Sequence, residues 1–281
     1  MVFLFNSLAR LPLPLLHVLG SGLGWLIYLA SPRYAARLRE NLAQAGWRDA
    51  VLRRAAIREA GKGVLELPWV WGREFDIVVA AVRQCTGWEV VEAARARGRG
   101  VIFLTPHIGC FEVIALYLAA RFPLTSLYRT PRYAWLDELM HRGRERGQMK
   151  LAAADLSGVR LLLKALKRGE AIGILPDQVP GNGEGEWAPF FGRPAYTMTL
   201  VGKLAQASGA PLILCIGERL PHGAGYALHF SEFVPDADIS LPLQLNAALE
   251  AVIRRYPAQY LWSYNRYKVP RGVEPPAVPG R

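Results

Sequence analysis

A histidine and a glutamate stand where a predicted strand gives way to a predicted helix. Residues 101–104 form an apolar run typical of a buried strand, His107 follows it, and Glu112 opens a helical pattern. A carboxylate beside a histidine fixes the imidazole tautomer and stabilises the imidazolium, so the histidine can act as a general base. Because Gly109 permits a tight turn between them, we expect Glu112 to orient His107 as a catalytic pair. In the alternative interpretation, His107 only satisfies a hydrogen bond at the strand end and Glu112 is a helix-start acid.

Other polar side chains also stand at the ends of predicted strands. Arg129 comes at the end of one apolar run, and Asp177 and Gln178 follow another. Ligands of such sheets usually bind beyond the carboxyl ends of the strands, so we expect these residues to bind substrate. Arg129 would clamp a phosphate or carboxylate, and Asp177 would order Arg129 or bind polar groups. The alternatives are a surface ion pair and an ordinary turn aspartate; Arg266, near the carboxyl end, is a weaker candidate for substrate contact.

The elements that must position these residues follow an α/β pattern. Short apolar runs alternate with amphipathic segments, which predicts a mixed, mostly parallel sheet flanked by helices. A helical segment precedes it, at 33–48, 49–71 and 75–97, with Pro68 expected to kink or end its second helix. A long loop is expected over 176–195. The expected strands are 100–105, 124–129, 149–152, 170–175, 211–217 and 225–233, and the expected helices are 110–121, 133–146, 157–168, 196–208 and 241–255.

The amino-terminal stretch 11–30 contains no Lys, Arg, Asp or Glu. As a helix it would reach roughly 30 Å, about the thickness of one hydrocarbon core. We expect a retained membrane anchor over 1–32, an enzymatic domain over 33–270 and a disordered Pro/Gly-rich tail over 271–281. The arginines at 33, 37 and 39 place that domain on the cytoplasmic side. The alternatives are a signal peptide and a helix that lies in the membrane interface.

Composition limits the partners of this chain. Its net charge is +11, which favours an anionic partner such as an acidic protein or an anionic membrane surface. Zinc-finger spacing, a basic heptad helix and RNA-binding aromatic signatures are missing, so nucleic acid is not expected. Three widely spaced cysteines suggest neither a zinc site nor a disulfide framework, and we expect no metal and no redox cofactor.

Three further features each have two interpretations. The aromatic loop at 186–192, "EWAPFFG", either folds back as core or lines an acyl-chain groove or the membrane interface, and we favour the second. The basic segment 141–150, "HRGRERGQMK", is either a solvated helix face or a docking patch for an acidic protein. Cys110 is either a buried small residue, which we favour, or the nucleophile of a thiol esterase.

Beyond single motifs, the order of segments resembles a known family over nearly the whole chain. The matching pieces are "RLRENLAQA", "TPHIGCFEV", "LYRTPRYAWLDELM", "GILPDQVPGNGEGEWAPFFGRPAYTMT" and "YLWSYNRYK". These resemble the bacterial lipid A biosynthesis acyltransferases, a late-acting branch of the His-x4-Asp/Glu acyltransferases. One departure is visible, because Cys110-Phe111 stands where the family often has Asn-Trp before the acid.

The resemblance implies a membrane-bound O-acyltransferase at the bacterial inner membrane. It would move a fatty acyl chain from an acyl carrier protein thioester, a co-substrate rather than a cofactor, to a hydroxyl of a lipid A precursor's 3-hydroxyacyl chain. His107 would take the hydroxyl proton, Glu112 would orient His107, and no acyl-enzyme would form. The alternatives are the same chemistry on a lysophospholipid or another lipid acceptor, and a non-catalytic protein that binds lipid or the carrier.

Overall fold

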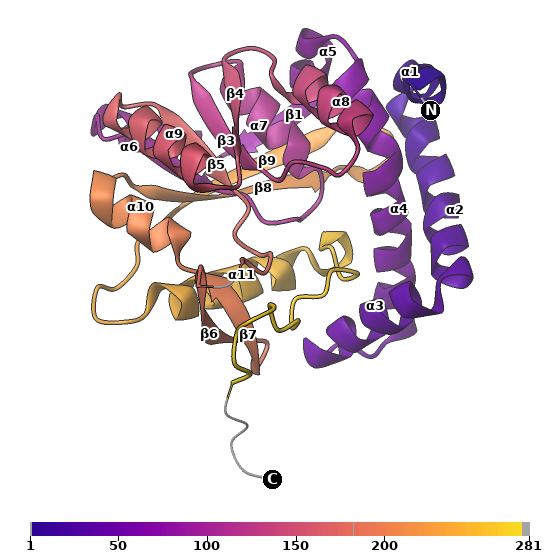
Figure 1. Ribbon diagram of the computed structural model, residues 1–281. Helices are drawn as coiled ribbons and strands as arrows, with labels where there is room; N and C mark the ends of the chain where they lie inside the picture. Colours follow the sequence, from indigo (N-terminus) through magenta and orange to yellow (C-terminus); the bar gives the residue numbers. More distant parts are fainter. Residues whose placement is uncertain (1, 182, 277–281) are drawn as a thin grey trace.

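A twisted seven-stranded sheet forms the centre of the protein. The computed structural model describes residues 2–181 and 183–276. Across the sheet the strands follow the order β1-β9-β8-β2-β5-β3-β4 (Figure 1). Their bounds are Val82–Thr86 (β1), Val101–Leu104 (β2), Leu124–Tyr128 (β3), Met149–Ala153 (β4), Ala171–Ile174 (β5), Leu212–Arg219 (β8) and Tyr226–Phe233 (β9).

The pairing of these strands confirms the predicted mixed, mostly parallel α/β sheet. All neighbours are parallel except β8 and β9, which form an antiparallel pair. Strands β2, β5, β3, β4 and β8 therefore end at the same edge of the sheet. Because β2 and β5 are buried along their whole length, the sequence shows continuous apolar runs there and not an alternating pattern.

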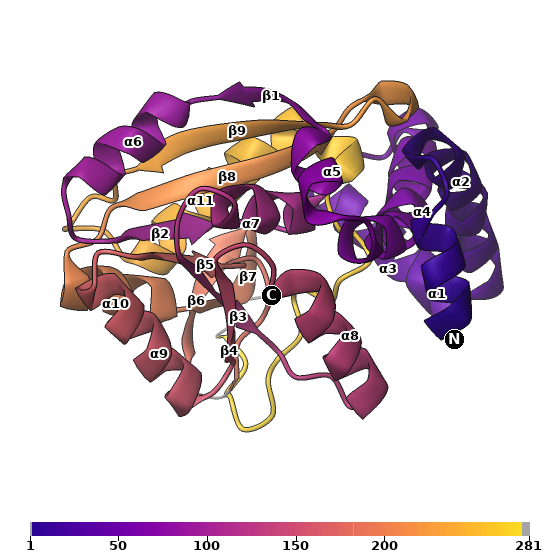
Figure 2. The same ribbon diagram turned by 90° about the horizontal axis from the view of Figure 1, so that it is seen from above.

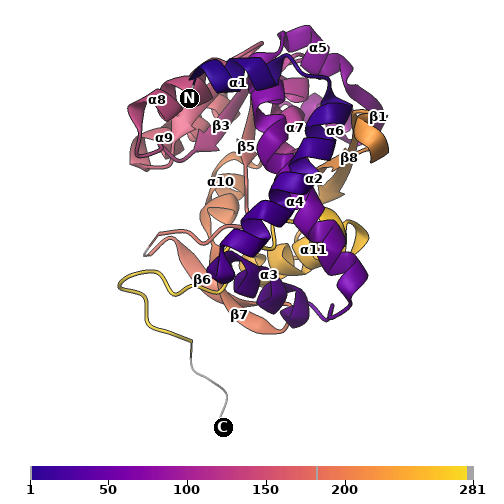
Figure 3. The ribbon, with the colours of Figure 1, turned by 90° about the vertical axis from the view of Figure 1, so that its right-hand side faces the viewer.

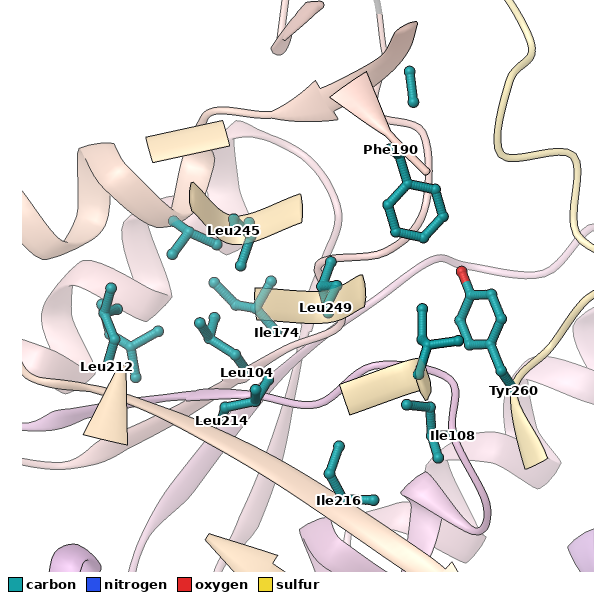
Figure 4. Close-up of a cluster of buried hydrophobic side chains, with 14 of the residues drawn as sticks. Leu104, Ile108, Ile174, Phe190, Leu212, Leu214, Ile216, Leu245, Leu249 and Tyr260 are labelled. Atoms are coloured by element: carbon teal, nitrogen blue, oxygen red, sulfur yellow. The ribbon is translucent and has the colours of Figure 1, made fainter. Parts of the chain in front are cut away.

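Helices cover both faces of the sheet and create two hydrophobic layers. One layer lies under α9 (Leu156–Lys167), α10 (Leu200–Ser208) and α11 (Leu241–Arg255), together with a hairpin of β6 (Gly185–Phe190) and β7 (Arg193–Met198). Figure 4 shows Leu104, Ile174 and Leu214 of the sheet packed against Leu245 and Leu249 of α11. The other layer lies under α5 (Phe75–Ala80), α6 (Trp88–Ala96) and α7 (Phe111–Ala119).

Four amino-terminal helices gather at one end of the sheet (Figure 2). They are α1 (Val2–Ala9), α2 (Leu13–Ala30), α3 (Pro32–Gln44) and α4 (Ala50–Gly72). Seen from that side, α2 lies on the outside of α4 (Figure 3). Helix α2 is long and apolar enough to cross a membrane by length and composition.

The two helices α2 and α4 approach so closely that their backbones touch at glycines. A Cβ atom on Gly24 would lie 2.1 Å from the carbonyl oxygen of Ile57, and one on Gly61 would lie 2.0 Å from that of Gly20. No side chain fits at these positions, so glycine is required for the contact. Gly20 and Gly24 of this apolar segment are therefore packing residues.

Three expectations about elements were wrong. The region 75–97 contains the strand β1 as well as two helices, and the expected loop 176–195 contains the hairpin β6–β7. Pro68 does not end helix α4, which was one of its two expected effects, and the helix continues to Gly72, because Trp69, Val70 and Trp71 are buried and hold the last turn in place. Residues 277–281 of the expected disordered tail lie outside the described residues, whereas Glu274 accepts a hydrogen bond from the Trp187 indole.

Two glycines on α2 provide a matched test of this packing. Gly24→Ala forces a methyl group into the α4 backbone, and overpacking of this kind costs typically ~1–3 kcal/mol. Gly22 faces open space, so Gly22→Ala gains helix propensity and stabilises by about 0.5–1 kcal/mol. Denaturant unfolding of the detergent-solubilised proteins measures both changes. Equal stabilities for the two variants would contradict the packing of α2 on α4.

Candidate active site

The loop after β2 holds His107 through backbone hydrogen bonds on both sides. The His107 carbonyl accepts from the N–H of Leu261, and the N–H groups of Gly109 and Cys110 donate to the carbonyls of Gln259 and Gly217. Gly109 adopts a φ of 58°, and a Cβ atom there would lie 2.0 Å from the Gly217 carbonyl oxygen. Glycine is therefore required in this loop, as the sequence suggested, because the chain turns with a positive φ against β8.

His107 is hydrogen-bonded to Asp177, which stands beyond the end of the neighbouring strand. Leu104 of β2 pairs with Ile174 of β5, and each of the two polar residues comes three positions later in its chain. Oδ1 of Asp177 lies 2.8 Å from Nδ1 of His107, and Oδ2 accepts the His107 backbone N–H at 2.9 Å. Burial alone would raise the pKa of Asp177, but the contacts with His107 outweigh burial and lower it. The carboxylate is therefore ionised at neutral pH and fixes the ring by two contacts.

The other ring nitrogen of His107 faces Gln178. The side-chain amide nitrogen of Gln178 lies 3.1 Å from Nε2 of His107. Because an amide nitrogen only donates, Nε2 is the acceptor, and Nδ1 carries the proton that is donated to Asp177. This tautomer leaves a lone pair on Nε2, which is the atom that a general base uses.

The predicted contact between Glu112 and His107 is not among the hydrogen bonds of the described residues. Glu112 lies in the first turn of α7, is buried, and accepts from the Trp71 indole at 3.1 Å. Arg144, at the end of α8 (Ala134–Arg144), grips the same carboxylate with Nε at 2.9 Å and with Nη2. Five residues of separation turn Glu112 toward α4 and α8, so Asp177 makes the contact with His107 that the sequence analysis assigned to Glu112.

A cavity of about 470 Å³ opens at this edge of the sheet, and His107 and Gln178 line it. Its apolar lining comes from Phe111, Leu127, Met140, Leu156, Val159, Leu175, Val179, Met198 and Leu200. Arg129, Arg144 and Lys203 add positive charge to the wall, and Asp155 and Glu184 add negative charge. The cavity thus combines a large apolar surface with ionic groups, which suits an amphiphilic ligand.

A smaller cavity of about 40 Å³ lies behind the first one, between α7 and strands β2, β3 and β5. The two cavities share Phe111, Leu127, Arg144 and Leu175 as lining residues. Glu112 lines the smaller cavity, and its Arg144 partner lines both. The Glu112–Arg144 pair therefore forms part of the wall between the two spaces.

Arg266 and the aromatic loop lie outside the lining of this cavity. Arg266 is 2% exposed and donates to the Tyr196 carbonyl, Thr197 Oγ1 and Asn246 Oδ1, which ties the hairpin β6–β7 to α11. Phe190 and Phe191 are buried in the hydrophobic layer. The expectation that this loop lines an acyl groove or dips into the membrane was wrong for these two rings, because they fold back as core.

The basic segment 141–150 is also less exposed than its sequence suggests. Arg144 is bound to Glu112, and Arg146 donates to the carbonyls of Val70, Arg73 and Gly143. Arg142 and Lys150 are exposed. Arg144 thus fastens α8 to α7, Arg146 fastens the following residues to the end of α4, and only part of the segment is available for a partner.

Cys110 is buried, as expected for a small packing residue. Burial raises the pKa of its thiol well above the ordinary value, and Glu66 raises it further. A buried thiol of raised pKa is a poor nucleophile, because the thiolate is the reactive form. The position and protonation of Cys110 therefore argue against a thiol esterase.

A buried ion pair that no sequence pattern indicated supports the His107 loop. Nε and Nη2 of Arg219, at the end of β8, bind the Glu66 carboxylate at 2.6–2.9 Å, and Nη2 also donates to the Gly109 carbonyl at 2.7 Å. His17 of α2 lies 3.4 Å from the same carboxylate. Glu66 stands inside a helical pattern and Arg219 at a strand end, and no local spacing relates them. The sequence indicated this ion pair only through two polar residues, Glu66 and His17, that each stand within an apolar stretch.

The parts described so far are those of an α/β enzyme for amphiphilic ligands, with a histidine and an aspartate at the carboxyl ends of adjacent strands. Comparison with known proteins identifies the family. Residues 1–269 match the family model of the bacterial lipid A biosynthesis acyltransferases, so the chain belongs to that family. It is an acyltransferase of lipid A biosynthesis.

Relatives with assigned reactions match over most of their length. The lipid A biosynthesis lauroyltransferase of Escherichia coli K12 is 29% identical over 288 residues, which cover 97% of this chain and 90% of the relative. The palmitoleoyltransferase of the same organism is 26% identical, covering 92% of this chain and 87% of the relative. Its myristoyltransferase is 22% identical over 63% of this chain and 56% of the relative.

The Glu66–Arg219 pair predicts a specific dependence of stability on pH. Burial alone would raise the pKa of Glu66, but Arg219 and His17 lower it from 4.5 to about 2. The ionised carboxylate therefore stabilises the fold fully above pH 4.5, and this contribution is lost as pH falls toward about 2. Glu66→Gln leaves the buried Arg219 guanidinium with only the longer ionic contact to Glu59 at 3.2 Å and costs about 3–5 kcal/mol at neutral pH.

Unfolding curves between pH 2 and 7 measure this effect. The stability of Glu66→Gln falls less steeply with acid than that of the natural protein. The exposed Glu89→Gln serves as the matched control and keeps the natural slope. An unchanged slope for Glu66→Gln would contradict the low pKa of Glu66.

Proposed function

We propose that this chain transfers a fatty acyl chain from an acyl carrier protein thioester to a hydroxyl of a lipid A precursor's 3-hydroxyacyl chain. The observation that carries the proposal is the His107–Asp177 hydrogen bond, which leaves Nε2 of His107 as an acceptor beside the cavity. Membership of the family supports the substrates, and the apolar lining supports a fatty chain. The named relatives transfer lauroyl, palmitoleoyl and myristoyl groups, so we expect a chain of that class.

In the proposed reaction the acceptor hydroxyl replaces the Gln178 amide at Nε2 of His107. His107 takes the hydroxyl proton while the oxygen attacks the thioester carbonyl carbon. The tetrahedral intermediate then expels the carrier thiolate, and the imidazolium returns the proton to that sulfur. The Asp177 carboxylate stabilises the imidazolium between these two steps, so no acyl-enzyme and no cofactor are needed.

Glu112 has a different role in this proposal from the one its spacing suggested. Its carboxylate holds the Arg144 guanidinium in the cavity wall by two hydrogen bonds. A fixed guanidinium in the wall of the cavity that His107 also lines provides positive charge for the oxyanion of the intermediate or for an anionic substrate group. The N–H groups of Gly109 and Cys110 are already used by Gln259 and Gly217, so they are not free to stabilise the oxyanion.

The same chemistry on a lysophospholipid is the second candidate. The cavity does not distinguish the two acceptors, because Arg129, Arg144 and Lys203 would bind the phosphate groups of either lipid. Membership of the lipid A family favours the first acceptor. Mass spectrometry of lipids from cells with and without this chain distinguishes the two, since one additional acyl chain appears either on lipid A or on a phospholipid.

His107 and Asp177 can be tested by paired substitutions. We expect His107→Ala to reduce transfer by roughly 10²-fold or more, the scale of a lost general base. Asp177→Asn removes the charge that fixes the tautomer and reduces the turnover rate by about 10²–10⁴-fold, with little change in KM. Turnover of purified proteins with an acyl carrier protein donor measures both. His222→Ala and Asp238→Asn, at exposed positions, are the controls, and near-natural transfer by His107→Ala would remove it from the mechanism.

Arg129 lines the cavity from the end of β3 and is exposed. We expect Arg129→Ala to weaken use of the acceptor by roughly tenfold or more, because one charge-assisted contact to an anionic group is lost. Steady-state kinetics with varied acceptor measure this as a raised KM. Arg132→Ala, an exposed neighbour, is the control. If both variants keep the natural KM and kcat, Arg129 does not bind the acceptor.

A further inference from the structure

The outward faces of α1 and α2 form an uncharged apolar surface, here called the amino-terminal face. On α2 the exposed large side chains recur on one side of the helix, and α1 adds two more. On α2 their spacing of three, four and seven residues places them on a single stripe. The members of the amino-terminal face are Phe3, Leu4, Leu15, Val18, Leu19, Leu26 and Leu29. An exposed apolar stripe of this length marks an interaction surface.

The inward face of α2 is committed to the protein body. Gly20 and Gly24 touch the backbone of α4, and His17 is buried beside the Glu66–Arg219 ion pair. Helix α4 itself carries Arg53, Arg54, Arg58, Glu59 and Lys62 along its length. Helix α2 cannot therefore enter a bilayer as an independent span while it keeps this packing.

Crossing the bilayer would require one of two costly arrangements. If α4 accompanied α2, its charged side chains would enter the hydrocarbon region, where each is strongly unfavourable. If α2 left α4, Glu66 would lose His17, and the glycine-lined contact would open. Lying flat avoids both, because the apolar stripe of α2 already faces outward while its polar and glycine contacts stay inside.

The charges around the amino-terminal face select an anionic partner. The first acidic residue of the chain is Glu40, whereas Arg10, Arg33 and Arg39 precede it and are exposed. Arg58 is also exposed, next to Ile57, which contacts Gly24. In a contact with a second copy of this chain, the arginines of the two copies would repel each other. Anionic lipid headgroups, in contrast, neutralise these arginines.

We propose that the amino-terminal face lies flat in the headgroup region of an anionic phospholipid leaflet, and that α2 does not cross the bilayer. The proposal rests on the membrane association of the proposed acyltransferase and specifies how the chain meets the lipid. Phe5 of α1 lies with its ring centroid 6.4 Å from that of Trp71, and Trp71 donates to Glu112 in the cavity wall. A chain of side-chain contacts then connects α1 at the lipid surface to the cavity wall.

Sidedness of labelling tests the orientation in the full-length protein. Ser7→Cys stands before α2 and Ala43→Cys stands after it, and both positions are exposed. An impermeant maleimide is applied to intact spheroplasts and to inverted vesicles. We expect both cysteines to react from the same side, at levels above those of the natural protein with its own three cysteines. Labelling of Ser7→Cys and Ala43→Cys from opposite sides would overturn the proposal.

Vesicle flotation tests the surface itself. The double variant Leu19→Glu/Leu26→Glu is expected to lose roughly tenfold or more of its partitioning onto phosphatidylglycerol-containing vesicles, because two apolar contacts become charged. Leu161→Glu, at an exposed leucine of α9, is the matched control and floats like the natural protein. Binding to neutral phosphatidylcholine vesicles is expected to be weaker for every protein. Unchanged flotation of the double variant would overturn the proposal.

Two controls separate this proposal from the proposed reaction and from self-association. His107→Ala floats like the natural protein even though it is inactive, so loss of transfer does not by itself affect the membrane result. The mass in detergent-free solution below the vesicle-binding concentration is measured by sedimentation. A dimer that Leu19→Glu/Leu26→Glu dissociates would mean that the amino-terminal face binds a second copy, and this would overturn the lipid assignment.

Discussion

The hydrogen bond between Asp177 and Nδ1 of His107 joins the ends of two adjacent strands, and the arrangement of the site depends on it. Parallel pairing of β2 with β5 places both residues at the same edge of the sheet in matching register. The buried carboxylate holds the imidazole with Nε2 toward the cavity. There the Gln178 amide donates to Nε2 at the place that the acceptor hydroxyl takes in the proposed reaction. A shift of β5 against β2 by one residue would turn the side chains of the shifted strand to the opposite face of the sheet, so the register of this strand pair sets the geometry of the candidate base.

Support for that geometry reaches into the amino-terminal helices. Arg219 donates to the Gly109 carbonyl in the His107 loop, and its charge is balanced by Glu66 of α4. His17 extends the same cluster to α2. The apolar segment that first suggested a separate anchor is thus physically connected to the loop of the active site. The Glu66 carboxylate therefore connects the packing of α2 on α4, through Arg219, to the Gly109 carbonyl two residues from His107.

Most of the α/β core could be predicted from the sequence, because buried parallel strands and their helices have distinct patterns of apolar residues. The order of strands could not, and it decides which polar residues meet. Asp177 and His107 were both recognised at strand ends, but nothing local indicates that β5 lies beside β2. Glu112 was assigned to His107 on spacing alone, and the competing Arg144 comes from a basic segment that looks like a solvated helix face. The predicted location of Phe190 was also wrong, because aromatic residues in a Gly/Pro-rich stretch are compatible with both a surface groove and a hairpin that packs in the core.

The separation of the two buried carboxylates has a chemical consequence. A single carboxylate that bound both His107 and Arg144 would couple the protonation of the imidazole to its contact with the guanidinium. With Asp177 on His107 and Glu112 on Arg144, each positive charge has its own carboxylate once the imidazole is protonated. Protonation of His107 then leaves the guanidinium in place. In the proposed reaction, a proton can therefore move to Nε2 and away again while the positive charge facing the intermediate stays fixed.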